Sequence, residues 1–313
     1  MSAVAFNAMG TSVRLEIGGV PRTRAAGMLA AGRKFIEGFD AALSRFRPES
    51  ELTLMNADPS ATVEVSWLMS ELIDAALWAA QASGGLVDPT LTPALERAGY
   101  AKSRVGVEPV DLAAALADAP ERRPATADPS SRWREITFDR GGRLLSRPPG
   151  VTFDSGGSGK GLAADLLART WAVSLGPRAH FMIDCGGDIR FGPRGNRWGR
   201  VRVENPFGGE PLELACASGA VATSSIRSRI WRDGDGAPAH HLIDPSTGTP
   251  AWTGVVAVTA LAPTALVAET LAKVGFLRGP VGARETLASA DGGLIVLDDG
   301  TTEAIEPGML AAA

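Results

Sequence analysis

Apolar and polar residues follow two different periods along this chain, and these periods predict its first strands and helices. Residues 13–17 alternate between apolar and polar side chains, as a half-buried strand does. Over residues 22–46 the apolar positions recur at helical spacing. A second helix is expected over residues 66–82, because Gly84 and Gly85 follow it and glycine often ends a helix. This part of the chain is therefore expected to form a strand followed by two helices.

The remainder of the chain is richer in strands. Residues 135–138 and 144–146 flank Asp-Arg-Gly-Gly, which predicts a hairpin. Helices are expected over residues 159–175 and, as the last helix, 265–276. Further strands are expected over residues 181–184, 201–204, 255–260 and 294–297. Because strands outnumber helices and several are joined by short turns, the pattern predicts an α+β fold with largely antiparallel sheets and packed helices.

One segment interrupts this pattern. Residues 106–131 are rich in Ala, Pro and Asp, and they predict a short helix followed by a surface linker. The linker is the one candidate boundary in a chain of 313 residues. We expect residues 1–313 to form a single functional unit around it.

Composition and charge exclude several classes of protein. The chain has 31 basic and 35 acidic residues and a net charge of -4, whereas a general affinity for nucleic acid or anionic membranes requires the opposite sign. The longest uncharged stretch, residues 251–268, contains Pro263, so a strand, a turn and a helix start fit it better than a membrane span. Residues 1–10 lack the pattern of a leader peptide. The chain as given is therefore expected in the cytoplasm, unless an export leader has been removed.

Two glycine-rich segments have the composition of ligand-binding loops. Gly-Gly-Leu-Val-Asp-Pro-Thr, residues 84–90, can bring backbone amides and the Asp88 carboxylate to a ligand, although a plain turn explains it more simply. Asp-Ser-Gly-Gly-Ser-Gly-Lys-Gly, residues 154–161, precedes a helix. Amides at a helix start, with Lys160 one turn in, suit an anion such as a pyrophosphate. The segment is not a Walker A loop, and a structural glycine turn remains an equal alternative.

Two further pairs of residues could take part in chemistry. His240 and His241 precede an Asp-Pro turn, and a histidine is the natural proton acceptor for a hydroxyl near neutral pH. A capping or core histidine is the alternative. Glu269 and Lys273 are four residues apart on one helix face. On their own they form an ordinary helix pair, worth ~0.2–0.5 kcal/mol.

Taken together and in this order, such segments resemble the FAD:protein FMN transferase (ApbE) family. The resemblance runs from Phe6 to about Gly279, nearly the whole chain. One segment alone would be weak support, whereas eight in the family's order are a specific pattern. The matching segments are residues 6–11, 43–56, 85–90, 154–165, 186–188, 222–224, 241–248 and 268–279.

The resemblance implies an activity and a fold. A Ser or Thr hydroxyl of an acceptor flavoprotein attacks the FMN-side phosphate of FAD, AMP leaves, and FMN stays attached through a phosphoester bond. The acceptor is expected to be a redox protein with a short Ser/Thr-containing motif. The implied fold is α+β, with the flavin in a cleft between sheet and loops. Two alternatives stay open: hydrolysis of FAD to FMN and AMP, and flavin binding without catalysis.

The resemblance also assigns roles to individual residues. His241 matches the general base for the acceptor hydroxyl. A backbone carbonyl near Gly157 matches one ligand of a magnesium ion. Residues that match FAD contacts are Met9, Phe46, Leu86, Val87, Asp88, Asp154, Lys160 and Leu242.

The chain departs from the family at the metal site. The family helix presents Asp and, four residues later, Thr or Ser to magnesium, whereas this chain has Glu269 and Lys273 at those positions. Glutamate can still bind magnesium, but a protonated lysine cannot. Our hypothesis is that Lys273 pairs with Glu269 and supplies the positive charge that a metal would give. The competing hypothesis is a protein that binds flavin but has lost the transfer chemistry.

Overall fold

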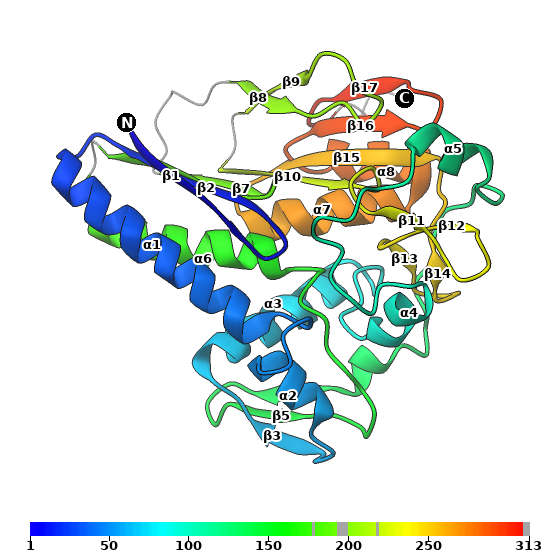
Figure 1. Cartoon of the computed structure of the whole chain (residues 1–313), viewed down its shortest axis with the longest axis horizontal. Coiled ribbons are helices and arrows are strands. Elements are labelled where there is room, and N and C mark those ends of the chain that lie inside the picture. Colours follow the sequence, from blue (N-terminus) through cyan, green and yellow to red (C-terminus); the bar gives the residue numbers. More distant parts are fainter. Residues whose placement is uncertain (177–178, 193–199, 217–218, 309–313) are drawn as a thin grey trace.

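The fold is built on one large antiparallel sheet (Figure 1). The computed structural model describes residues 1–308 except 177–178, 193–199 and 217–218. All neighbouring strands in the sheet run antiparallel, so the predicted α+β fold with largely antiparallel sheets is confirmed. In spatial order the strands are β1 (Ser2–Ala8), β2 (Thr11–Gly18), β6 (His180–Cys185), β7 (Ile189–Gly192), β10 (Ala220–Ser225), β15 (Val255–Ala262), β16 (Gly293–Leu297) and β17 (Thr302–Ile305).

Smaller sheets surround the large one. The predicted hairpin is present as β4 (Thr137–Asp139) and β5 (Leu144–Ser146), and β5 also pairs with β3 (Thr62–Glu64). Three two-stranded sheets are formed by β8 (Arg200–Val203) with β9 (Leu212–Ala215), β11 (Ile230–Arg232) with β12 (Pro238–His240), and β13 (Ile243–Asp244) with β14 (Thr249–Pro250).

Three helices run beneath the large sheet in Figure 1: α1 (Arg22–Leu43), α6 (Gly159–Ser174) and α7 (Ala265–Leu277). The alternation predicted for residues 13–17 is observed, because Val13, Leu15 and Ile17 of β2 are buried in the core beneath the sheet. Burial of this apolar surface contributes roughly 25 cal/mol per Å² and fixes the helices against the sheet. The other helices are α2 (Glu51–Ala57), α3 (Trp67–Ala82), α4 (Thr92–Arg97), α5 (Leu112–Ala117) and α8 (Gly279–Ala288).

The structure corrects two expectations. The first strand was expected at residues 13–17, but β1 precedes it and includes residues 6–8, and Met9 (φ 52°) and Gly10 (φ 69°) form the turn into β2. The helix at residues 265–276 is not the last one, because α8 follows it directly. Gly279 (φ 70°) breaks the helical path, and Pro280 then occupies the first turn of α8, where proline is well tolerated.

The segment 106–131 contains the expected short helix, α5, and most of its residues are exposed. It is nevertheless fixed to the body of the protein. The Arg123 amide donates to the carbonyl of Trp252 (2.9 Å), and the Ala125 amide donates to the carbonyl of Leu277 (2.7 Å). The single-unit organisation of the chain stays a prediction. In the part of the chain that the structure describes, no helix has both the length and the apolar composition needed to cross a bilayer.

The N-termini of α6 and α7 are held close together. The Asp165 carboxylate accepts hydrogen bonds from the amides of Ala265 (3.0 Å) and Leu266 (2.9 Å), and so caps α7 from α6. A Cβ at Gly161 would lie 2.7 Å from the Ala265 carbonyl, so only glycine permits this approach. The first turn of α6 is therefore held against α7, so that side chains of the two helices can meet in one site.

Candidate active site

A cleft of about 1060 Å³ opens beside the start of α6 and the C-terminal half of α7. It brings together nearly all the residues that the sequence singled out, from segments far apart in the chain. Glu269 (1% exposed) and His240 (0% exposed) are the two that are buried outside the lining. The lining includes Met9, Phe46, Leu86, Val87, Asp88, Asp154, Gly157, Lys160, His241, Leu242 and Lys273.

Lys160 presents its ammonium group to the cleft from the first turn of α6. Its Nζ lies 2.8 Å from Oδ2 of Asp188, a residue that is 1% exposed and outside the lining. Burial opposes the charged form of Lys160, but the carboxylates of Asp188 and Glu269 outweigh it and raise the lysine pKa. The helix start and the charged lysine together form a site suited to an anion.

A second ion pair lies on α7, next to the first. Nζ of Lys273 lies 2.9 Å from Oε1 of Glu269, and Oε2 of Glu269 accepts a hydrogen bond from the amide of Gly161 (2.9 Å). Burial raises the pKa of Glu269, while the Lys273 charge opposes that shift. The Glu269–Lys273 pair predicted from the spacing is therefore present. It is buried rather than solvated, and it is linked to α6 by the hydrogen bond from the Gly161 amide.

These residues do not fit a magnesium ion at the family's position. Magnesium needs several oxygen ligands in tight octahedral geometry. Both carboxylate oxygens of Glu269 already have partners, and one of them is the Lys273 ammonium group, which cannot be a ligand. No group of three or more His, Cys, Asp or Glu side chains among the described residues could hold a metal ion.

The two neighbouring histidines have different surroundings. His241 is half-buried and lines the cleft, and its Nδ1 has no hydrogen-bond partner in the structure. Burial lowers the pKa of His241 well below its usual value, and the positive charges of Arg229, Lys273 and Lys160 lower it further. The imidazole is therefore neutral near pH 7 and able to accept a proton. His240 instead packs edge-on against Trp252 (4.7 Å between ring centroids), so it is a core histidine.

The core histidine makes stability depend on pH. Burial lowers the pKa of His240 from 6.5 to about 3, so the unfolded chain binds a proton that the folded chain does not. Stability is therefore lost as pH falls from about 6.5 towards 3, by roughly 2 kcal/mol at pH 5. In urea unfolding, His240→Asn should reduce the difference in unfolding free energy between pH 7 and pH 5 by about that amount. His180→Asn, at an exposed histidine, is the control. If the difference in unfolding free energy between pH 7 and pH 5 were the same in the two variants, His240 would not be the buried neutral histidine that makes stability depend on pH.

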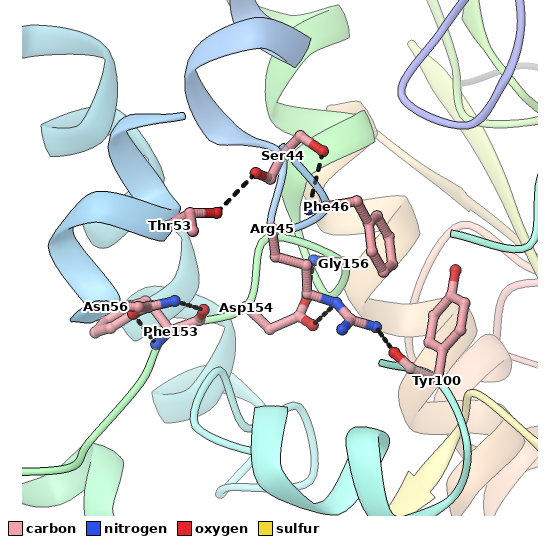
Figure 2. Close-up of polar contacts among 9 residues, drawn as sticks. All are labelled: Ser44, Arg45, Phe46, Thr53, Asn56, Tyr100, Phe153, Asp154 and Gly156. Atoms are coloured by element: carbon pink, nitrogen blue, oxygen red, sulfur yellow. Dashed lines mark hydrogen bonds and ion pairs between the residues drawn. The ribbon is translucent and has the colours of Figure 1, made fainter. Parts of the chain in front are cut away.

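Arg45 is a buried residue of the site that the sequence analysis missed (Figure 2). Its Nε lies 2.9 Å from Oδ2 of Asp154, and Nη2 donates to the carbonyl of Tyr100 (2.7 Å). The guanidinium group lies over the rings of Phe46 (4.2 Å to the centroid) and Tyr100 (4.6 Å). Arg45 thus joins residues 154–161, the glycine loop, to an aromatic wall of the cleft formed by Phe46 and Tyr100.

The carboxylates of Asp154 and Asp88 form their hydrogen bonds and ion pairs with other groups of the protein. Asp154 accepts from Arg45 and from the amide of Gly156, as Figure 2 shows. Asp88 accepts from the amide (2.7 Å) and hydroxyl (2.6 Å) of Thr90 and also from the Ser131 hydroxyl. Both residues therefore hold loops of the cleft in shape. For residues 84–90, these contacts of Asp88 agree with the simpler alternative, a plain turn.

The segment at residues 43–56 holds the glycine loop in place (Figure 2). The Asn56 side chain donates to the carbonyl of Phe153 and accepts from its amide, both at 2.8 Å. The Ser50 hydroxyl donates to the carbonyl of Ser44 (2.6 Å) and caps α2. These bonds fix the chain immediately before Asp154.

Arg229 is a second residue that the sequence analysis missed. It lines the cleft close to His241 and Lys160, and it forms no salt bridge with any described residue. Neither its spacing nor its neighbours in the sequence distinguish it from other arginines, so only the folded chain reveals its position.

The sheet, the anion site and the neutral histidine define an α+β protein with a cleft suited to phosphate chemistry. The chain belongs to the ApbE family, whose model matches residues 9–297.

Relatives and solved structures agree with this assignment. The FAD:protein FMN transferase of Salmonella typhimurium is 28% identical over 269 residues, 83% of this chain and 74% of the relative. The enzyme of the same name from Escherichia coli K12 is 26% identical over 289 residues, 89% of this chain and 79% of the relative. The crystal structure of the ApbE protein from Thermotoga maritima superposes with a TM-score of 0.79 at 28% identity, covering 97% of both chains. The flavin transferase ApbE from Vibrio cholerae has the same fold, with a TM-score of 0.70 at 22% identity and 97% coverage of both chains.

Proposed function

We propose that this protein transfers FMN from FAD to a Ser or Thr hydroxyl of an acceptor flavoprotein and releases AMP. The observation that carries the proposal is the neutral His241 imidazole in the same cleft as the Lys160 anion site. A proton acceptor beside a phosphate site is what hydroxyl attack on a phosphoester requires. The relatives that share most of their length with this chain are named for this activity.

The chemical step is a phosphoryl transfer. The acceptor hydroxyl oxygen bonds to the FMN-side phosphorus of FAD, and the bond from that phosphorus to the bridging oxygen breaks. AMP leaves with the bridging oxygen, and the hydroxyl proton passes to His241. Lys160, in the first turn of α6, stabilises the charge on the phosphate oxygens. The acceptor is proposed to carry its hydroxyl in a short Ser/Thr-containing motif.

The remaining residues of the cleft fit the two ring systems of FAD. Met9, Leu86, Val87 and Leu242 supply apolar contacts, and Phe46 supplies an aromatic face. Tyr100 extends this wall, because its ring packs edge-on against Phe46 (5.4 Å) and stacks on Trp231 (5.4 Å). Flat, largely apolar surfaces of this kind bind flavin and adenine rings.

A direct assay tests this proposal. The purified protein is incubated with FAD and a flavoprotein fragment that carries a Ser/Thr flavinylation motif, and AMP, FMN and FAD are separated by chromatography. We expect one molecule of AMP to be released for each flavin attached to the fragment. No flavin should be attached when the Ser or Thr of the motif is replaced by alanine. AMP together with free FMN would instead indicate FAD hydrolysis. FAD that is retained but never cleaved would indicate a flavin-binding protein.

A further inference from the structure

We propose that the Lys273 ammonium group takes the place of a divalent metal ion against the pyrophosphate of FAD, so that this protein works without one. The inference rests on the proposed function, because it concerns the same cleft. It follows from the way in which two buried ion pairs are oriented, and from what the Glu269 carboxylate already binds.

Both ion pairs present their cation to the cleft and keep their carboxylate behind it. The Lys160 side chain is 23% exposed, against 1% for Asp188, and the Lys273 side chain is 13% exposed, against 2% for Glu269. The two lysines line the cleft, and their two partners do not. A ligand in the cleft therefore meets the two ammonium groups and not the carboxylates.

Glu269 holds Lys273 in position instead of binding a metal ion. One oxygen of its carboxylate accepts from Lys273, and the other accepts from the Gly161 amide of α6. A metal ion at this carboxylate would lie next to the ammonium group, and the two positive charges would repel each other. Glu269 thus fixes Lys273 relative to α6, the helix that carries Lys160.

The burial of this pair is hard to explain by stability alone. A Glu–Lys pair at this spacing stabilises a helix on a solvated face, where neither charge has to be desolvated. A buried pair loses hydration on both partners, and replacing it with apolar side chains often leaves stability unchanged or improves it. The buried position is explained if the ammonium group has a ligand in the cleft.

The charge of such a cleft suits the proposed reaction. Lys160, Lys273 and Arg229 line the same cleft as His241, so a phosphate bound in this cleft would lie among positive charges. Phosphoryl transfer is catalysed mainly by positioning and by positive charge near the phosphate oxygens. Fixed ammonium and guanidinium groups can supply that charge as donors to phosphate oxygens.

The test uses the full chain, FAD and Mn²⁺ as the metal probe. The variants are Lys273→Met, which removes the charge, and Glu269→Asp with Lys273→Thr, which restores the family's metal-binding pair. Lys34→Met, at an exposed lysine of α1, is the matched control. The three readouts are AMP release in EDTA and in Mg²⁺, FAD affinity by fluorescence titration, and Mn²⁺ binding to the FAD complex by electron paramagnetic resonance.

We expect AMP release by the unmodified chain to be equal in EDTA and in Mg²⁺, and its FAD complex to bind no Mn²⁺. Lys273→Met should lose about 10²-fold in AMP release, without rescue by Mg²⁺, and about 10-fold in FAD affinity. The double variant should bind Mn²⁺, and Lys34→Met should behave like the unmodified chain.

Loss of AMP release in EDTA with recovery in Mg²⁺, or binding of Mn²⁺ by the unmodified complex, would overturn the inference. If no acceptor or condition yields AMP, the proposed function fails, and the FAD affinity and Mn²⁺ measurements still decide the role of Lys273.

Discussion

Replacing His241 with glutamine should lower kcat/KM for flavin transfer by about 10²–10⁴-fold and change FAD affinity only a few-fold. The imidazole is neutral because burial and nearby cations hold its pKa down, so it can accept the hydroxyl proton throughout the neutral range. Glutamine fills similar space but cannot take up that proton. The measurement is the rate of flavin attachment to the acceptor fragment, with FAD affinity measured separately by fluorescence titration.

The lowered pKa of His241 also predicts how the transfer rate depends on pH. Because the pKa of His241 is lowered, the transfer rate of the unmodified chain should stay level as pH falls from 8 to about 6. The groups that act on the imidazole are Arg229, His240, Lys273 and Lys160. His180→Gln is the control, at an exposed histidine outside the cleft. A His241→Gln variant that keeps more than about a tenth of the transfer rate would rule out general-base catalysis by this residue.

Replacing Arg45 with methionine should destabilise the protein by about 3–5 kcal/mol, because it leaves the buried Asp154 carboxylate without its partner. The side chains are 8% and 10% exposed, so water replaces the guanidinium group only in part. FAD affinity should fall as well, since Arg45 also supports Phe46 and Tyr100. Urea unfolding and fluorescence titration measure the two effects.

Two further variants show whether the effect comes from the unpaired charge. Adding Asp154→Asn to Arg45→Met should recover part of the lost stability, because the buried negative charge is gone. Arg33→Met removes an arginine from an exposed pair with Glu37 (2.7 Å) and should cost less than about 1 kcal/mol. Equal losses at Arg45 and Arg33 would show that the buried pair is no more important than a surface one.

Most elements of the fold can be predicted from this sequence because their local signals agree with their tertiary surroundings. Ser66 caps α3, and Gly84 (φ 65°) follows its end, so that helix has the expected bounds within one residue. The errors arise where a local signal is ambiguous. Gly279 and Pro280 are typical of a helix end, yet they also start α8. The sequence of β1, Ser-Ala-Val-Ala-Phe-Asn-Ala, lacks a regular alternation of apolar and polar residues, so only its pairing with β2 identifies it as a strand.

The site is predictable to the extent that its residues lie in recognisable motifs. The glycine loop, His241 and the α7 pair were found in this way, and the structure gathers them around one cleft. Arg45 and Arg229 could not be found, because their importance depends on partners distant in sequence. Arg45 contacts Tyr100 and Asp154 across more than fifty residues. The internal bonding of Asp154 is likewise a property of the folded chain, since the motif alone allows it to face a ligand.

The junction between α6 and α7 has a consequence for how the cleft responds to a substrate. Asp165 and Gly161 fix the two helices against each other, and the ion pairs with Asp188 and Glu269 hold the two ammonium groups in place on them. Little reorganisation of these dipoles and charges is needed as the phosphate changes its bonding, and such preorganisation lowers an activation barrier. The cleft is therefore expected to act as a rigid electrostatic template, with no closing motion required to assemble it.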